Sequence, residues 1–306
     1  MDLLVRLRFD HELFTLTIGL LGLMVGSFLN VVIHRLPRIL ENGWRRECTE
    51  LCASDTEDHQ THSTDRPDLA TPAYNLLTPG SHCPSCSTPL RWRDNIPVLS
   101  WLLLKGRCAS CGKKISAQYP LVESITCLVS ATVAAKCGFS LETIFGLVIS
   151  WYLIAMSGID LNTQLLPDNL TLPLLWAGLV ASAVVGHGGV LPFPAKLPDA
   201  VMGAVTGYLV LWSVYQLFKL ATGKEGMGYG DFKLLAALGA WLGWQLLLPV
   251  LLFAAASGAV IGSALLLAKR QGREIPIPFG PYLAFAGWLA MLWTPELISP
   301  WWAFAQ

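Results

Sequence analysis

The chain has 306 residues, of which 53% are hydrophobic and 14% are charged, and its formal net charge is zero. Soluble domains usually carry about 25% charged residues. The composition therefore argues against a large soluble protein with buried helices. A balanced charge gives no sign of a nucleic-acid partner, and none is expected.

Uncharged apolar stretches recur along the chain, and several are long enough to cross a bilayer. A hydrocarbon core of about 30 Å needs roughly 20 apolar residues in a helix. The sequence predicts an all-α polytopic membrane protein with about eight transmembrane helices, which centre on Leu13–Ile33, Gln118–Ala135, Thr143–Ile159, Asn169–Val185, Pro198–Phe218, Asp231–Gln245, Pro249–Ala268 and Phe279–Leu297.

Residues 35–117 are the only sizeable polar segment, and they separate the first two predicted helices. Within them, Glu41–Ala70 has few large apolar residues, which predicts a mobile insertion. The rest of the segment contains two C-x2-C pairs, Cys83 with Cys86 and Cys108 with Cys111, separated by 21 residues.

Two C-x2-C pairs can supply the four thiolates of a tetrahedral zinc site, and four thiolates leave no open position for catalysis. In a reducing cytosolic segment, metal is favoured over disulfides. We therefore expect a small cytoplasmic domain with structural zinc. A redox pair and unligated thiols are the alternatives, and His82 could compete as a ligand.

Further along, the uncharged stretch from Leu234 to Ala268 is too long for one span, and we expect a break at Gly243–Pro249 because proline rarely continues a helix. Basic residues set the orientation, since cytoplasmic loops are enriched in them. With both termini outside and residues 35–117 inside, the outer segments hold only four of the 21 basic residues: Arg6, Arg8, Lys136 and Lys196.

Acidic residues in or beside membrane spans are costly, so those present are candidates for function. Asp160 and Asp231 fall at the inner ends of the third and sixth predicted spans. Two carboxylates that meet share a proton, and such a pair can activate water. Asp168 and Asp199 follow prolines before spans, where capping is expected. Asp231 could also be an N-cap, after Gly228-Tyr229-Gly230.

Several motifs, in order from Gly22 to Tyr282, resemble those of the type IV prepilin peptidases. These are the opening Gly26-Ser-Phe28-Leu-Asn30 segment continuing to Pro37, the double C-x2-C, Gln118-Tyr-Pro-Leu-Val-Glu123, Gly158-Ile-Asp160 through Leu166-Pro-Asp168, and Gly228-Tyr-Gly-Asp231-Phe-Lys233.

The resemblance implies a bifunctional enzyme of the bacterial inner membrane. Such enzymes cut the leader of type IV prepilins and type II secretion pseudopilins after glycine. They then methylate the new N-terminus with S-adenosylmethionine. Matched by motif, the catalytic aspartates are Asp160 and Asp231. Methyl transfer is attributed to the N-terminal part, where Gly26, Phe28, Asn30 and Glu123 are candidate contacts to the methyl donor.

The resemblance also implies three parts: residues 1–34 as the first transmembrane helix, 35–117 as the cytoplasmic cysteine domain, and 118–306 as the peptidase domain. Two alternatives stay open. One is a peptidase without methyl transfer, and the other is an ion-coupled transporter, which would place carboxylates near the bilayer midplane.

Overall fold

The computed structural model describes residues 2–54, 74–185, 193–224, 226–269 and 278–302. It contains α1 (Asp2–Phe9), α2 (His11–Ser54), a 3-10 turn η1 (Trp92–Asn95), α3 (Leu99–Leu103), α4 (Gln118–Cys137), α5 (Leu141–Thr163), α6 (Asp168–Val185), α7 (Leu197–Thr222), α8 (Tyr229–Leu242), η2 (Trp244–Leu246), α9 (Leu247–Lys269) and α10 (Gly280–Trp302).

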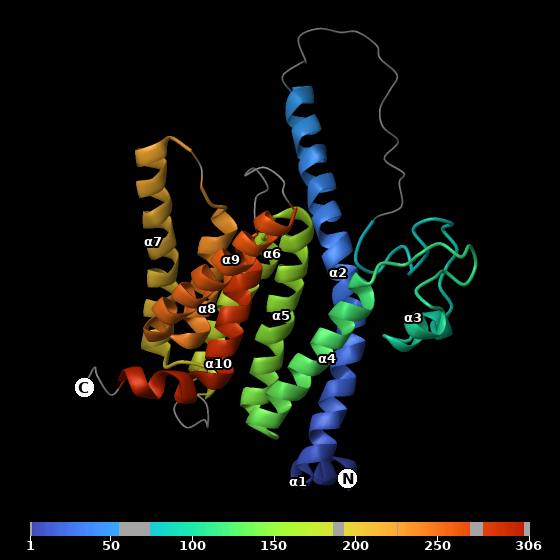
Figure 1. Cartoon of the computed structure of the whole chain (residues 1–306), viewed down its shortest axis with the longest axis horizontal. Helices are drawn as coiled ribbons and strands as arrows, with labels where there is room; N and C mark the ends of the chain where they lie inside the picture. Colours follow the sequence, from blue (N-terminus) through green and yellow to red (C-terminus); the bar gives the residue numbers. More distant parts are fainter. Residues whose placement is uncertain (1, 55–73, 186–192, 225, 270–277, 303–306) are drawn as a thin grey trace.

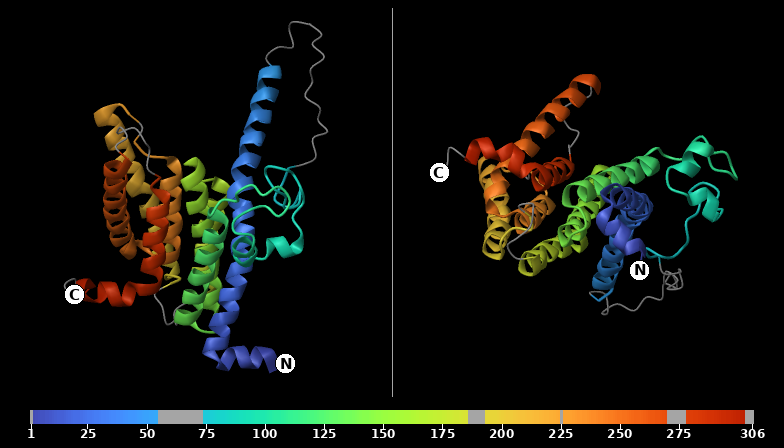
Figure 2. Two further views of the ribbon diagram at one scale, coloured as in Figure 1. Left: turned by 45° about the vertical axis from the view of Figure 1, so that its right-hand side comes forward. Right: turned by 90° about the horizontal axis from the view of Figure 1, so that it is seen from below.

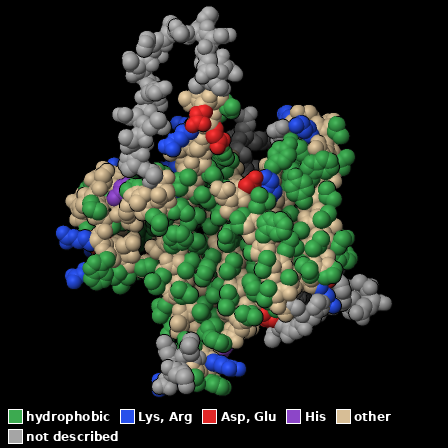
Figure 3. Space-filling model, turned by 180° about the vertical axis from the view of Figure 1, so that it is seen from behind, with side chains coloured by type: hydrophobic (Ala, Val, Ile, Leu, Met, Phe, Trp, Pro, Cys, Tyr) green, Lys and Arg blue, Asp and Glu red, His purple; other side chains and the backbone are tan. Residues whose placement is uncertain are grey.

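The predicted all-α fold is confirmed. Each of the eight predicted spans corresponds to a helix, and the described residues contain only two isolated β-bridges and no strand. Within the described residues, six spans are long and apolar enough to cross a membrane, in α2, α4, α5, α6, α7 and the η2–α9 segment. Over the helical part of the surface in Figure 3, hydrophobic side chains predominate, and charged ones gather toward the ends.

The helices form two groups that meet at α5. On one flank, α2 and α4 pack along each other, and the cysteine-containing segment with α3 lies beside them (Figure 1). On the other, α7, α8, α9 and α10 gather together (Figure 2). Helix α1 and the C-terminal part of α10 lie at the same end of the bundle, opposite to the end where α2 projects.

Helix α2 differs from the expectation of a short span followed by a mobile insertion. It continues without interruption to Ser54, with Pro37 inside it, so the prediction was wrong for Glu41–Ser54. Straight-chain and charged residues there, such as Arg45, Arg46 and Glu47, are good helix formers. The rest of the predicted insertion lies outside the described residues.

Helix α8 is the core of the second group. All residues from Asp231 to Leu242 except Lys233 are buried, as expected for a helix that is apolar on nearly every side. The Trp241 indole donates to the Leu174 carbonyl at 2.9 Å and ties α8 to α6. The predicted break follows at Gly243, whose φ of 82° ends α8. Pro249 lies in the first turn of α9, where proline is tolerated.

Glycines permit a very close helix contact between α7 and α8. A Cβ on Gly203 would overlap the Gly239 carbonyl, and a Cβ on Gly239 would overlap the Gly203 carbonyl. Gly207 has the same relation to the Leu235 carbonyl. Small residues of this kind let membrane helices approach closely and pack by van der Waals contact.

Gly203→Ala is therefore expected to destabilise the bundle by about 1–3 kcal/mol, because added bulk at a tight contact forces the helices apart. Thermal unfolding of the full chain in detergent measures the effect. The matched control is Gly43→Ala, at a helical position with open space around it. That change should be neutral or stabilise by about 1 kcal/mol. An unchanged melting temperature for Gly203→Ala would contradict the contact.

Candidate active site and cysteine cluster

Asp160 lies in the last turn of α5 and is 5% exposed. Gln164 closes this helix in the left-handed conformation, with φ of 55°. The Asp160 carboxylate accepts a hydrogen bond of 3.0 Å from the Gly280 amide, at the first residue of α10. The first amides of a helix lack partners within it and favour negative charge, so α10 holds this carboxylate in place.

Asp231 lies in the first turn of α8 and is 8% exposed. Gly228, with an extended backbone, is the N-cap of that helix, so Asp231 is not a cap. A Cβ on Gly230 would lie 2.5 Å from Leu166 Cβ. Glycine at this position lets α8 begin directly against the turn between α5 and α6.

The two aspartates face one region of the bundle. The two carboxyl groups lie close enough for a negative charge on Asp160 to disfavour one on Asp231. Leu166 lies next to Gly230, which directly precedes Asp231, and next to Gly280, whose amide binds Asp160. The structure thus brings together the two carboxylates that the sequence had paired, at the junction of α5, α8 and α10.

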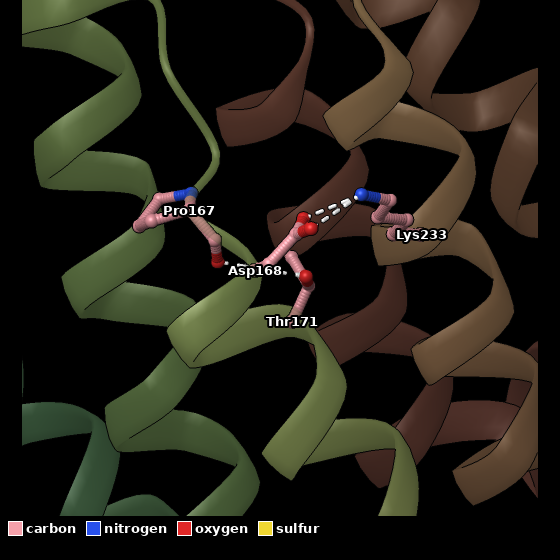
Figure 4. A network of polar contacts seen from close by, with 4 residues as sticks. All are labelled: Pro167, Asp168, Thr171 and Lys233. Atoms are coloured by element: carbon pink, nitrogen blue, oxygen red, sulfur yellow. Dashed lines mark hydrogen bonds and ion pairs between the residues drawn. The ribbon is translucent and has the colours of Figure 1, made fainter. Parts of the chain in front are cut away.

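Asp168 and Asp199 were expected to be helix caps, and their side chains make different contacts. Asp168 is the first residue of α6, and its carboxylate binds the Lys233 ammonium of α8 at 2.6 and 2.7 Å (Figure 4). Asp199 lies in the first turn of α7, after the N-cap Lys196. It accepts from Trp244 and Gln245 and links α7 to η2.

Two contacts were not predicted from the sequence: the hydrogen bond from the Gly280 amide to Asp160 and the ion pair between Lys233 and Asp168. The step from Gly280 to Pro281 does signal a helix start, since proline is favoured in the first turn. However, no local pattern indicates that this start meets a carboxylate 120 residues earlier in the chain.

The four predicted cysteine ligands form one cluster, in which all sulfur atoms lie within 4.8 Å of one another. Each pair sits in the same backbone turn. The Cys83 amide donates to Thr88 O and the Ser87 amide to Cys83 O; the Cys108 amide donates to Lys113 O and the Gly112 amide to Cys108 O. Ser87 and Gly112, 25 positions apart, both have positive φ.

This sulfur set fits a tetrahedral metal ion. Zinc–sulfur bonds of about 2.3 Å place neighbouring sulfurs roughly 3.8 Å apart, and Cys83 Sγ lies 3.9 Å from Cys111 Sγ. Hydrogen bonds with Thr88 lower the pKa of the Cys86 thiol to about 6, whereas burial and the neighbouring sulfurs raise the pKa of the Cys111 thiol to about 11. The fit to a metal ion therefore rests on the geometry of the four sulfurs. The His82 ring lies against the Gly80 carbonyl, at 2.9 Å.

The candidate contacts to a methyl donor do not all meet. Gly26 packs on α4, where a Cβ would lie 2.7 Å from Glu123 Cα. Asn30 is 3% exposed and donates to the Tyr119 carbonyl at 3.0 Å. Glu123 is 7% exposed and accepts from the Val98 amide at 2.7 Å. Phe28, 50% exposed, is not part of this group.

Comparison with known proteins supplies the family. Residues 20–137 match the family described as Bacterial Peptidase A24 N-terminal domain, and residues 147–263 match the Type IV leader peptidase family. A protein of Aeromonas salmonicida named Prepilin leader peptidase/N-methyltransferase is 53% identical over 91% of this chain and 90% of its own length.

The chain belongs to the type IV leader peptidase family. Proteins with the same name from Pseudomonas aeruginosa and Xanthomonas campestris are 49% and 47% identical. They cover 97% and 93% of this chain, and 96% and 93% of their own lengths are matched. No solved structure matches the chain.

In this member of the leader peptidase family, the Asp168–Lys233 ion pair joins α6 to α8 two residues after Asp231. Both side chains are partly exposed, at 53% and 27%, so we expect a coupling of about 0.5–1 kcal/mol. A double-mutant cycle with Asp168→Asn and Lys233→Met, followed by thermal unfolding at low and high salt, measures it. The coupling should shrink at high salt. Strictly additive single changes at low salt would show that the pair contributes nothing.

Proposed function

We propose that this protein is a bifunctional membrane enzyme that removes the leader peptide of type IV prepilins and pseudopilins and methylates the new N-terminus. The meeting of two buried carboxylates, Asp160 and Asp231, carries the peptidase half. The names of the relatives, which match nearly the full length of the chain, support both halves.

In this mechanism the two aspartates act as a pair with one proton between them. The ionised carboxylate takes a proton from water while the oxygen of that water bonds to the carbonyl carbon of the scissile peptide. The neutral carboxylic acid polarises the carbonyl oxygen. The carbon–nitrogen bond then breaks, and the leaving amine takes the proton. The Gly280 amide keeps Asp160 oriented through these steps.

The substrate's position follows from its own chemistry. An apolar pilin helix would lie in the bilayer beside the enzyme, with its basic leader in the cytosol. The scissile bond then lies at the inner surface of a bacterial inner membrane. The distribution of basic residues supports this orientation.

For methyl transfer we propose S-adenosylmethionine as the donor. When bound, it supplies a methyl group on a positively charged sulfur. The new N-terminal amine would lose a proton to solvent and so become able to receive this methyl group. The protein must bind and orient the two reactants, and the N-terminal helices α2 and α4 offer buried polar groups for this.

The alternatives have less support. A transporter would leave the cysteine cluster without a role. A peptidase without methyl transfer is disfavoured because the named relatives carry both activities in their names and share the N-terminal part of the chain.

The catalytic assignment predicts that Asp160→Asn and Asp231→Asn each lower cleavage by about 10³-fold, since proton transfer by a positioned group contributes in that range. Purified full-length enzyme, a prepilin in detergent and a gel assay for the shortened product measure this rate. Asp199→Asn is the matched control, because asparagine keeps its two hydrogen bonds, and it should cleave like wild type. Cleavage at the wild-type rate by either active-site variant would refute the assignment.

We also propose that Cys83, Cys86, Cys108 and Cys111 hold one structural zinc ion. Cys108→Ser removes a ligand, so metal analysis of the purified protein should fall from about one zinc per chain toward zero. Cys127→Ser, in α4 and outside the cluster, is the control and should keep the metal. Zinc content well below one per chain in freshly prepared wild-type protein would exclude the proposal.

A further inference from the structure

The cysteine-containing segment exposes an apolar surface on α3. Leu99, Leu102 and Leu103 are 50%, 59% and 73% exposed, and their spacing of three and four positions puts them on one side of the helix. We call these three leucines the α3 edge. Trp101 points into the segment instead, since its indole donates to the Ile115 carbonyl at 3.3 Å. The interior of the segment thus takes up the tryptophan and leaves the leucines outside, and exposed apolar groups that gather in this way mark an interaction surface.

The segment that carries this edge is strongly basic. Residues 74–117 include six basic residues and a single acidic one, Asp94. Arg91 and Arg93 flank Trp92, which is 75% exposed in η1. All six basic residues are exposed: Arg91, Arg93, Lys105, Arg107, Lys113 and Lys114. In Figure 3, basic side chains at the outer edge of this segment lie beside hydrophobic ones. Exposed leucine and tryptophan next to lysine and arginine are typical of surfaces that bind anionic lipid headgroups.

One hydrogen bond fixes the depth of α3 relative to the membrane-spanning helices. The amide of Val98, the residue directly before α3, donates to the Glu123 carboxylate at 2.7 Å. Glu123 lies inside α4, whose residues Gln118–Cys137 are long and apolar enough to cross a membrane. At a rise of 1.5 Å per residue, Glu123 is about 7–8 Å from the start of that span. Helix α3 is therefore attached alongside α4 and not beyond its end, as Figure 1 also shows.

The surface of α4 at this level is apolar too. Leu121, Ile125 and Leu128 are 58%, 41% and 67% exposed, and they are four and three positions apart, on one side of the helix. In a membrane span, exposed apolar side chains of this kind contact lipid. Leu121 is only two residues before Glu123, the residue that binds Val98. The lipid-facing surface of α4 thus begins at the level where α3 is attached, so a helix held there meets acyl chains as well as water.

We propose that the α3 edge inserts into the leaflet on the side of the cysteine cluster, and that nearby cations, Arg91 and Arg93 among them, bind the headgroups of anionic lipids. A bilayer suits this surface because leucines, a tryptophan and cations occur together at the depth where acyl chains meet headgroups. A second copy of the chain does not suit it, since two basic segments repel each other. The inference goes beyond the proposed function and depends on neither of its activities.

Fluorescence quenching measures the depth of the edge. A fluorescent amino acid replaces Leu103 in the full-length protein, which is placed in nanodiscs whose lipids are brominated near the headgroup end of their acyl chains. Bromine quenches probes that enter the leaflet. The same probe at Leu128, exposed on α4, is the reference for lipid contact, and at Thr49, exposed near the end of α2, it is the reference for water. The probe at Leu103 should be quenched at least half as strongly as that at Leu128.

The role of the cations is tested with the same probe at Leu103, in nanodiscs that mix anionic phosphatidylglycerol with zwitterionic phosphatidylcholine in equal parts. Only one of the two lipids is brominated at a time. Brominated phosphatidylglycerol should quench about twofold more than brominated phosphatidylcholine, because cations gather anionic lipid around the edge. Arg91→Gln combined with Arg93→Gln should bring this ratio close to one. The matched control is Arg45→Gln with Arg46→Gln, at exposed positions on the projecting part of α2, which should keep the wild-type ratio.

Each result decides one part of the proposal. Quenching at Leu103 that is less than half of that at Leu128 overturns the insertion, and it would mark the α3 edge as a surface for a protein partner. Equal quenching by the two lipids in wild type, or a ratio that the changes at Arg91 and Arg93 leave as it was, overturns the binding of anionic lipid by these arginines. Cleavage and methylation play no part in these measurements, so a failure of the proposed function would leave their outcome unaffected.

Discussion

Burying two carboxylates at one junction of helices is the constraint that the rest of the structure satisfies. An aspartate in a membrane protein needs partners that replace water, and Asp160 finds one in the first amide of α10. Asp231 requires a helix that starts close by, which Gly230 permits by removing the bulk that Leu166 would meet. Helices α5, α8 and α10 are thereby fixed relative to one another.

That arrangement depends in turn on how closely the surrounding helices can approach. Helix α8 is buried along most of its length, and it reaches α7 through paired glycines that leave room for backbone contact. The Trp241 indole closes the opposite side against α6. Because most of α8 packs against other helices, its contacts help to fix the position of Asp231 at its start.

Much of the architecture could be predicted from local patterns. Uncharged stretches gave the helices in their correct order, and glycine with proline marked the break after α8. The spacing of the cysteines predicted their cluster, because each C-x2-C folds into its own turn. The pairing of Asp160 with Asp231 came from resemblance more than from spacing, since many loop-to-helix junctions contain an aspartate.

Contacts that join distant parts of the chain could not be predicted from the sequence. Neither the hydrogen bond from Gly280 to Asp160 nor the ion pair between Asp168 and Lys233 has a local pattern that predicts it. The helical extension of α2 was missed for a different reason. Its polar composition is common to mobile segments and to solvent-exposed helices, and only helix propensity distinguishes the two.

The length of α2 has a mechanical consequence. Its 44 residues span about 66 Å, more than twice the thickness of the hydrocarbon core. The returning segment is fastened near the middle of this rod, where the Arg35 guanidinium donates to the carbonyls of Asn75, Leu76 and Gly80. If the rod tilts about that middle, its far tip moves by many ångströms while the cysteine cluster stays close to the pivot. A change in the direction of the tip would therefore displace the four clustered cysteines much less than the tip itself.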